Sequence, residues 1–254
     1  ISLELTMRFI RYKTDLTPAR YGWILETPEG NLVGPVEGAP FGDFRRLDAD
    51  QPLEKVELLA PLLPGKIICI GRNYVEHIHE LGNEIPSSMV VFNKPNSAIT
   101  NTLRYISPDT RFEGEICFLM MGGSIAGIGF GLDLTKAQIQ NHLKSKGLPW
   151  ERAKGFDGSA VLGTFVPFAA PLESLRMTLH INGTLVQEAT VDLMIYKPLA
   201  MTEEIQSFMR LEDGDIIMSG TPKGVATYTI GDEFVGRIYS HNVVLVESKW
   251  RVER

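Results

Sequence analysis

The sequence predicts an α+β fold that is rich in strands. Short apolar runs typical of strands recur along the chain, whereas helices are expected only at 74–82, 134–146 and 201–208. These helices do not alternate regularly with the strands, which argues against a doubly wound parallel sheet. Asn182-Gly183 lies between two apolar runs, and this dipeptide is a strong signal for an antiparallel hairpin.

The N-terminal quarter is expected to form a small β-rich unit. Three short runs, at 7–12, 21–27 and 31–36, are strand candidates, and a Pro-Glu-Gly-Asn turn separates the last two. A polar, proline-containing stretch then covers 47–66. The 254 residues, 44% of them hydrophobic, suffice for a small domain followed by a larger one. We therefore predict units at 1–63 and 64–254.

The larger unit is predicted to hold most of the strands and all three helices. Glycines at 71 and 82 bracket the first helical segment and could let it move as a lid. Gly122-Gly123 joins two adjacent strand candidates in a tight turn. The predicted strands are 66–70, 89–93, 113–121, 124–131, 160–166, 175–181, 184–187, 215–219 and 243–250.

Composition narrows the possible partners and location. The net charge is -6, with no basic run and no interleaving of basic and aromatic residues, which argues against nucleic-acid binding. No apolar run reaches the roughly 18 residues that a membrane span needs, and no signal segment is apparent. Cys69 and Cys117 lie inside apolar strand-like runs, so both are interpreted as reduced core residues of a cytoplasmic protein.

Three acidic residues, Glu113, Glu115 and Asp133, are the strongest candidates for a metal site. Side chains two residues apart on a strand share a face, so the two glutamates are expected to lie side by side. Asp133 ends the next strand and adds a further oxygen ligand. Paired strand glutamates most often form a solvated acidic face, but the apolar flanks here predict burial. Buried oxygen ligands without His or Cys suit Mg²⁺ first, with Mn²⁺ or Ca²⁺ possible.

The segment Gly71–Gly82 holds a candidate general base. His77 and Glu80 are three residues apart and share a helix face, and a carboxylate raises the basicity of an adjacent imidazole. Such a pair can activate water. His79 and Glu76 form a similar pair on another face, so spacing alone leaves the assignment open, as it does for an exposed helix with incidental ion pairs.

Lysines and a glycine-rich turn supply further candidates. Lys94, Lys154 and Lys223 lie in otherwise apolar or glycine-rich surroundings and could stabilise a developing enolate, although an isolated lysine is usually a surface charge. Thr221 lies in a turn whose hydroxyl and N–H groups could bind a carboxylate. This turn lacks the phosphate-loop pattern, and no Gly-x-Ser-x-Gly elbow occurs, which excludes nucleotide binding and a serine hydrolase.

Six segments in fixed order resemble the fumarylacetoacetate hydrolase superfamily. The resemblance covers about 66–230, and the segment at 147–154 is similar to the acylpyruvase and oxaloacetate decarboxylase branch. The segments are KIICIGRNYVEHIHE, FNKP, FEGEICFLM, GFGLDLT, GLPWERAKGFDGSAVLGTFVP and LEDGDIIMSGTPKGV. The resemblance implies a β-rich, mixed-sheet α+β catalytic domain, a Mg²⁺ or Mn²⁺ cofactor and a homodimer.

The resemblance also implies roles for individual residues. Glu113, Glu115 and Asp133 match the metal ligands, and His77 with Glu80 matches the water-activating dyad. Lys154 matches the lysine that stabilises an enolate-like leaving group. Substrate contacts are implied for Arg72, Lys94, Gln140 and Thr221.

One position departs from the family pattern. After the ligand aspartate, family members commonly carry an arginine that meets the distal group of the substrate, and here that position is Ala137. The loss removes a planar carboxylate clamp. Lys136 is adjacent, but successive helix residues diverge by about 100°, so it is no obvious substitute. Either the substrate differs, another cation replaces the arginine, or activity is reduced.

The resemblance favours an enzyme that cleaves a 2,4-dioxo acid, of acylpyruvate or fumarylpyruvate type, by metal-dependent water attack and C–C bond hydrolysis. The same site can decarboxylate oxaloacetate. A second possibility is isomerisation or hydration of an unsaturated 2-oxo acid in aromatic catabolism. A third is a metal-binding member of the family with little catalysis, to which Ala137 points.

Overall fold

The computed structural model describes residues 9–38, 43–60, 65–169 and 171–254. The predicted boundary at 63/64 and the start of the first predicted strand, 7–8, lie outside the described residues. Within them the fold is a strand-rich α+β arrangement, as predicted, with four α-helices. No helix in these ranges is long and apolar enough to cross a membrane.

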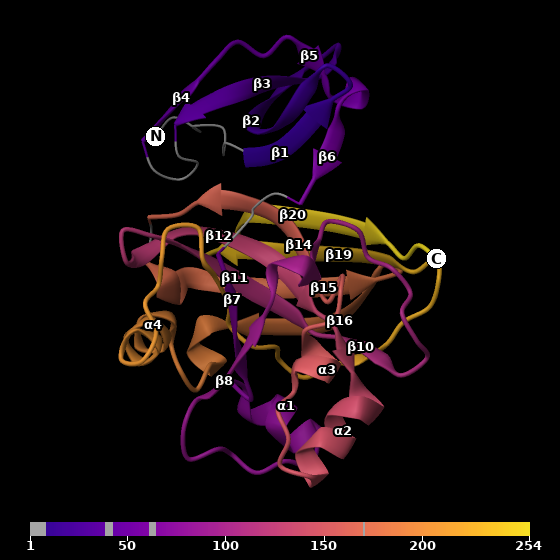
Figure 1. The fold of residues 1–254 in the computed structure, drawn as a ribbon, viewed down its shortest axis with the longest axis vertical. Helices are drawn as coiled ribbons and strands as arrows, with labels where there is room; N and C mark the ends of the chain where they lie inside the picture. Colours follow the sequence, from indigo (N-terminus) through magenta and orange to yellow (C-terminus); the bar gives the residue numbers. More distant parts are fainter. Residues whose placement is uncertain (1–8, 39–42, 61–64, 170) are drawn as a thin grey trace.

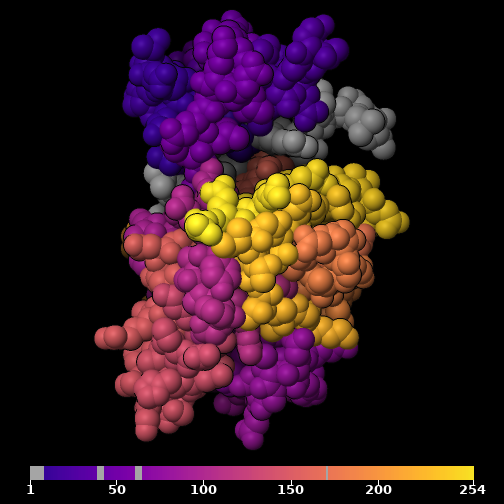
Figure 2. All heavy atoms as spheres, turned by 90° about the vertical axis from the view of Figure 1, so that its right-hand side faces the viewer, coloured from indigo at the N-terminus to yellow at the C-terminus, as the bar shows by residue number. Residues whose placement is uncertain are grey.

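The N-terminal strands form a distinct layer at one end of the molecule (Figure 1). Antiparallel pairing joins β1 to β2, β2 to β3 and β3 to β4, and the short β5 and β6 pair with β3 and β1. The strands are β1 (Phe9–Thr14), β2 (Thr17–Thr27), β3 (Gly30–Gly38), β4 (Phe44–Arg46), β5 (Gln51–Pro52) and β6 (Glu57–Leu59). Figure 2 shows this layer stacked against the C-terminal part of the chain.

A mixed sheet carries the candidate site. Its order continues from β1 through β14, β12, β11, β17 and β7 to β8. The pairs β7–β17 and β9–β14 are parallel, and the others in this part of the sheet are antiparallel. The bounds are β7 (Ile67–Gly71), β8 (Val90–Lys94), β9 (Ile99–Thr100), β11 (Gly114–Met121), β12 (Ser124–Asp133), β14 (Ala160–Pro167) and β17 (Ile216–Met218).

A second sheet of four strands covers one face of the first. It has the order β16-β15-β19-β20, with β15 (Leu175–Ile181), β16 (Thr184–Thr190), β19 (Glu233–Ser240) and β20 (Val243–Arg251). The main apolar core includes side chains of both sheets, such as Phe130 and Ile116 from one and Phe234 and Val246 from the other. Burying these side chains supplies about 25 cal/mol per Å² of apolar surface, and this holds the two layers together.

Four helices and a small third sheet complete the described part of the fold. The helices are α1 (Val75–Glu80), α2 (Ala137–Ser145), α3 (Glu151–Lys154) and α4 (Pro198–Gln206). Helices α1, α2 and α3 gather at the end of the molecule that lies opposite the N-terminal layer (Figure 1). A small third sheet has the order β13-β10-β18, from β10 (Thr110–Phe112), β13 (Thr135–Lys136) and β18 (Ala226–Thr227).

Most predicted elements are present with shifted ends. All nine strands predicted between 66 and 250 occur, and the hairpin turn has Asn182 and Gly183 at φ 50° and 81°, as a tight hairpin turn requires. Helix α2 begins three residues later than predicted, because Thr135 and Lys136 pair with β10. Strand β19, helix α3 and the short strands β4, β5, β6, β9, β10, β13 and β18 were not predicted. Both cysteines are buried and free, as expected for core thiols.

Candidate functional site

The hairpin of β11 and β12 brings the three acidic residues together. Glu113 immediately precedes β11 and Asp133 ends β12, and the N–H of Asp133 donates to the carbonyl of Glu113 at 2.9 Å. One carboxylate oxygen from each of Glu113, Glu115 and Asp133 lies within 4.8 Å of the others. The candidate ligands therefore converge as the spacing predicted, and Glu115 and Asp133 are almost fully buried.

Lys154 binds two of the three carboxylates. Its ammonium donates to Glu113 Oε2 at 2.9 Å and to Asp133 Oδ2 at 2.7 Å. Burial lowers the pKa of Lys154, but the two carboxylates outweigh it, and the pKa is raised overall. Lys154 therefore stays protonated across the physiological range and serves as a cation and hydrogen-bond donor rather than a base.

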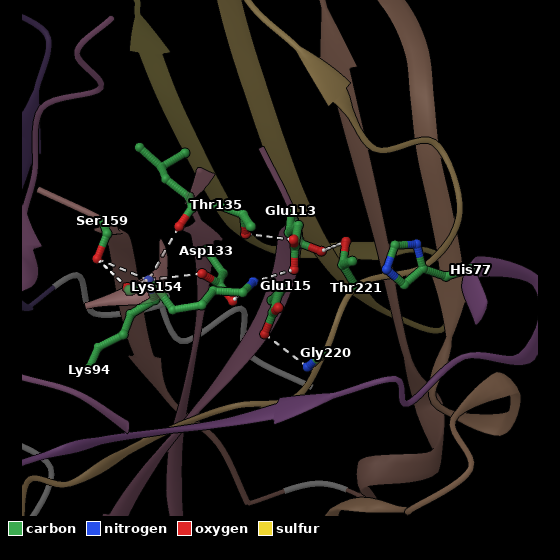
Figure 3. A network of polar contacts seen from close by, with 12 residues as sticks. His77, Lys94, Glu113, Glu115, Asp133, Thr135, Lys154, Ser159, Gly220 and Thr221 are labelled. Atoms are coloured by element: carbon green, nitrogen blue, oxygen red, sulfur yellow. Dashed lines mark hydrogen bonds and ion pairs between the residues drawn. The ribbon is translucent and has the colours of Figure 1, made fainter. Parts of the chain in front are cut away.

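Lys94 forms a second ion pair with Asp133. Its ammonium is fully buried, lies 2.9 Å from Asp133 Oδ1 and donates to Ser159 Oγ at 2.9 Å and to the carbonyl of Lys154. A buried lysine is tolerated only with such partners. Figure 3 shows both lysines entering the acidic cluster from one side, with the His77 ring on the other.

Glu115 has no cationic partner among the described residues. The N–H of Gly220 donates to its Oε2 at 2.8 Å, and no lysine, arginine or histidine nitrogen of the described chain lies within 4.0 Å of it. Burial raises its pKa well above the ordinary value, and the charges of Asp133 and Glu113 raise it further. Glu113 differs, because Lys154 and His77 outweigh its burial and lower its pKa.

This charge balance fits a divalent cation. Three carboxylates face two lysines, and the unpaired member, Glu115, has a pKa that burial and the two neighbouring carboxylates raise. Oxygen-only donors match the preference of Mg²⁺ and Mn²⁺. Glu113, Glu115 and Asp133 would hold such an ion, which would restore the missing positive charge.

The raised pKa of Glu115 predicts a pH dependence of the metal-free protein. The unfolded carboxyl titrates near its ordinary value of 4.5, whereas the folded protein keeps the proton to higher pH. The folded state then binds more protons, so the free energy of unfolding falls as pH rises from about 4.5 through the folded pKa. Urea unfolding of EDTA-treated protein between pH 5 and 8 measures this decline.

Saturating Mg²⁺ is the control for this prediction. A bound cation stabilises the charged carboxylate, so the decline should shrink or vanish in its presence. A metal-free stability that rises with pH over this window would contradict the assigned origin of the shift.

Helix α1 presents the predicted dyad. His77 Nδ1 lies 3.2 Å from Glu80 Oε2, and Glu80 Oε1 accepts the N–H of Gly224 at 2.9 Å. The alternative pair is not formed, because Glu76 instead lies 3.0 Å from Lys223 Nζ on the surface. Lys223 is thus a surface charge, and the imidazole associated with the site is that of His77.

A small cavity of about 40 Å³ is lined by His77 of the dyad and by Glu113 of the acidic cluster. Its polar lining comes from α1, α2, α3 and the segments next to β7 and β11. Besides Asn83, the polar side chains of the lining are those of Arg72, His77, Glu113, Gln140, Lys144 and Lys154. Five of these six residues were predicted from the sequence, and Lys144 was not.

Lys94 and Thr221 are placed differently from the expectation of substrate contact. Neither lines this cavity. The hydroxyl of Thr221 donates to the carbonyl of Gly114 at 2.9 Å and lies 2.8 Å from the amide nitrogen of Gln187, so it ties the turn to β11. Both residues contact the elements that carry the site but do not line its cavity. Their contact with substrate stays a prediction.

Sequence reasoning missed four supporting residues. Thr135 Oγ1 donates to Glu113 Oε1 at 2.6 Å, and Ser159 Oγ accepts a hydrogen bond from the ammonium of Lys94. Gly220 at φ 93° places its N–H on Glu115, and a Cβ there would lie 2.9 Å from the Ile70 carbonyl. Lys144 lines the cavity. Three of the four lie in the segments that carry the family resemblance, which is the signal that could have marked them.

Comparison with known proteins agrees with this geometry. The family model for the fumarylacetoacetate (FAA) hydrolase C-terminal domain matches residues 66–248, and the Rv2993c-like N-terminal model matches 7–61. Oxaloacetate tautomerase YcgM of Escherichia coli (strain K12) is 32% identical over 198 residues, which cover 70% of this chain and 90% of that protein.

Two solved structures share the fold. One is 2-hydroxyhepta-2,4-diene-1,7-dioate isomerase from Mycobacterium marinum, with a TM-score of 0.78, 28% identity and 98% of each chain covered. The other is fumarylpyruvate hydrolase from Pseudomonas aeruginosa in complex with Mn²⁺ and pyruvate, with a TM-score of 0.67, 26% identity, and 77% of this chain and 91% of that chain covered.

The family model spans all the candidate site residues, from Arg72 to Thr221. The fold and the convergent acidic cluster are those expected from the resemblance in the sequence. The chain therefore belongs to the fumarylacetoacetate hydrolase family.

Proposed function

We propose that the chain is a divalent-metal-dependent enzyme that moves a proton at the carbon next to the 2-oxo group of a 2-oxo acid, as in the keto–enol tautomerisation of oxaloacetate. The observation that carries this proposal is the acidic cluster of Glu113, Glu115 and Asp133, two of whose members bind a protonated Lys154, next to a cavity that Glu113, Lys154 and His77 line. The similarity to an oxaloacetate tautomerase over 90% of its length supports the substrate class.

Each group has a distinct part in this chemistry. A bound Mg²⁺ or Mn²⁺ would act as a Lewis acid on the 2-oxo carboxylate. Lys154 stabilises the negative charge that develops on the enolate oxygen, because its ammonium is fixed and water is excluded around it. Since Lys154 stays protonated, the proton is taken by another group, and His77, held by Glu80, is the base that lines the cavity.

Hydrolytic cleavage of an acylpyruvate is the second candidate. The His77–Glu80 pair favours it, because an imidazole oriented by a carboxylate can activate water for attack on a distal carbonyl. A fumarylpyruvate hydrolase shares this fold. Proton NMR in D₂O separates the candidates: exchange at C3 without pyruvate release indicates tautomerisation, and pyruvate release from acylpyruvates indicates cleavage.

The same assay covers the remaining alternatives. Isomerisation of an unsaturated 2-oxo acid would conserve mass and release no pyruvate. The fold shared with an isomerase supports this alternative. A metal-binding protein with little catalysis would be stabilised by oxalate and Mg²⁺ together but would turn over none of these acids. Turnover of oxaloacetate enol with EDTA-sensitive rates supports the leading proposal over both.

Replacing His77 tests the assigned base. We expect His77→Gln to lower the tautomerisation rate by about 10²- to 10⁴-fold, the range that a general base contributes. The metal should still bind, so oxalate with Mg²⁺ should raise the melting temperature as in the wild type. The matched control is His79→Gln on the exposed face of α1. An unchanged rate in His77→Gln would show that another group takes the proton.

Three broader proposals accompany the activity. Residues 1–63 form a small β unit and 64–254 the catalytic domain, the protein is a homodimer, and it acts in the cytoplasm on a small molecule. The separate family models at 7–61 and 66–248 support the division into two units. Light scattering coupled to size exclusion tests the dimer, and a mass near the 28.3 kDa of one chain would contradict it.

A further inference from the structure

Two cationic side chains at the cavity have no carboxylate partner. Arg72 and Lys144 both line it, and no Asp or Glu oxygen of the described residues lies within 4.0 Å of either. Lys154, in contrast, is held by Glu113 and Asp133. Uncompensated positive charge in a partly buried pocket is unfavourable until an anion enters it.

Arg72 is held in place with spare donor capacity. Its backbone lies in the left-handed region at φ 56°, which is costly for a residue with a Cβ. One guanidinium nitrogen donates to Asn83 Oδ1 at 3.2 Å, while the buried Nε has no hydrogen-bond partner. An arginine with an unmet buried donor at a cavity is suited to a planar anion such as a carboxylate.

Lys144 lies on α2 close to Arg72. Its ammonium is over the ring of Trp150, 5.3 Å from the centroid, and is half-buried. Burial lowers its pKa, and the neighbouring charge of Arg72 lowers it further, so the two cations repel each other across the cavity. An anion between them would relieve both effects.

The face of α2 explains how this cation takes the place of a missing arginine. Residues 137, 140 and 144 are spaced by three and four, so Ala137, Gln140 and Lys144 share one helix face. Lys144 therefore supplies a positive charge on the face where Ala137 has none. Lys136 does not, because its ammonium packs 4.3 Å from the ring centroid of Phe156 and does not line the cavity.

We infer that Arg72 and Lys144 bind the distal carboxylate of a 2-oxo dicarboxylic acid whose 2-oxo acid end lies at Glu113, Glu115 and Asp133. This inference rests on the proposed function for the position of the 2-oxo acid end. It assigns the substrate class as a diacid, in preference to a 2-oxo monocarboxylic acid. The cavity of about 40 Å³ has room for only about three water-sized groups, so a long distal chain does not fit in it.

Binding to the Mg²⁺-loaded protein tests the inference without relying on turnover. Isothermal titration compares three acids: oxaloacetate, 2-oxobutanoate, in which a methyl group replaces the distal carboxylate, and oxalate, which needs only the metal end. We expect the wild type to bind oxaloacetate at least 10-fold more tightly than 2-oxobutanoate. Lys144→Gln should lower the oxaloacetate affinity by about 10-fold or more, as loss of a charged hydrogen bond does.

The controls separate this inference from the proposed function. Oxalate and 2-oxobutanoate affinities should change less than 2-fold in Lys144→Gln, Lys144→Arg should restore the preference, and Lys146→Gln, exposed two residues away, should match the wild type. Equal loss for all three acids, or no loss for oxaloacetate, overturns the distal site. Normal affinities without any turnover overturn the proposed function and leave the distal site standing.

Discussion

Asp133→Ala is expected to abolish turnover and metal binding together. Asp133 is one of three converging candidate ligands, and its two oxygens also form ion pairs with the ammonium groups of Lys94 and Lys154. A metal that acts as a Lewis acid contributes several kcal/mol to the reaction, so the rate should fall by at least about 10³-fold. Mg²⁺ with oxalate should no longer raise the melting temperature, which differential scanning fluorimetry measures.

The same variant should also lose stability, because two buried ammonium groups lose their shared partner. Removing one member of a buried ion pair costs about 3–5 kcal/mol. The free energy of unfolding in EDTA, from urea titration, measures this cost. The control is Asp157→Ala, an exposed aspartate near Lys154 in the sequence. If Asp133→Ala kept wild-type turnover, the assignment of the metal site would be wrong.

The sequence was sufficient for the features that depend on local pattern. Two apolar runs joined by the Gly122-Gly123 turn predict adjacent strands, and the structure pairs them, with Glu115 opposite Gly131. The three-residue spacing allows a contact for His77 and Glu80, and the structure forms this pair, whereas Glu76 contacts Lys223 instead. These features form because neighbours in sequence are neighbours in space.

Strand β19 could not be predicted, because its pattern is hidden by a glycine. Phe234, Gly236 and Ile238 are the buried positions of this strand, and Gly236 shows no apolar side chain in the sequence. The ring of Phe130 requires the glycine, since a Cβ would lie 2.4 Å from it. The strand pairs with β20, which follows it through a tight turn, and with β15, which lies far earlier in the sequence, so its place in the sheet depends on tertiary context.

The roles of the lysines were equally inaccessible from local sequence. Lys94 and Lys154 both lie in segments that resemble the family, yet their positions differ. Lys94 contacts Asp133 away from the cavity, whereas Lys154 lines the cavity. Their separation follows from contacts across 40 and 60 residues, from Lys94 to the carbonyls of Leu134 and Lys154. Lys144 gave no signal, because an isolated lysine on a polar helix is usually a solvated charge.

Glu115→Gln is expected to abolish turnover while raising the stability of the metal-free protein. Burial and two neighbouring carboxylates disfavour the charge of Glu115, and glutamine removes that charge at nearly constant shape. The amide oxygen can still accept the N–H of Gly220, and the amide N–H groups can donate to the adjacent carboxylates. We expect the free energy of unfolding in EDTA at pH 7.5 to rise by about 1–2 kcal/mol, of the size seen when buried charges are replaced by neutral groups.

Glu113→Gln provides the matched comparison two residues away, and its sign should be opposite. Glu113 holds the buried ammonium of Lys154, which lowers its pKa, so the same chemical change removes a favourable ion pair and destabilises the metal-free protein. Both variants should lose metal-dependent stabilisation and turnover. The decline of stability with pH should flatten in Glu115→Gln and not in Glu113→Gln, because the pKa of Glu115 is raised whereas that of Glu113 is lowered. If both variants were destabilised equally in EDTA, the three carboxylates would form one evenly neutralised cluster, and the need for an added cation at Glu115 would disappear.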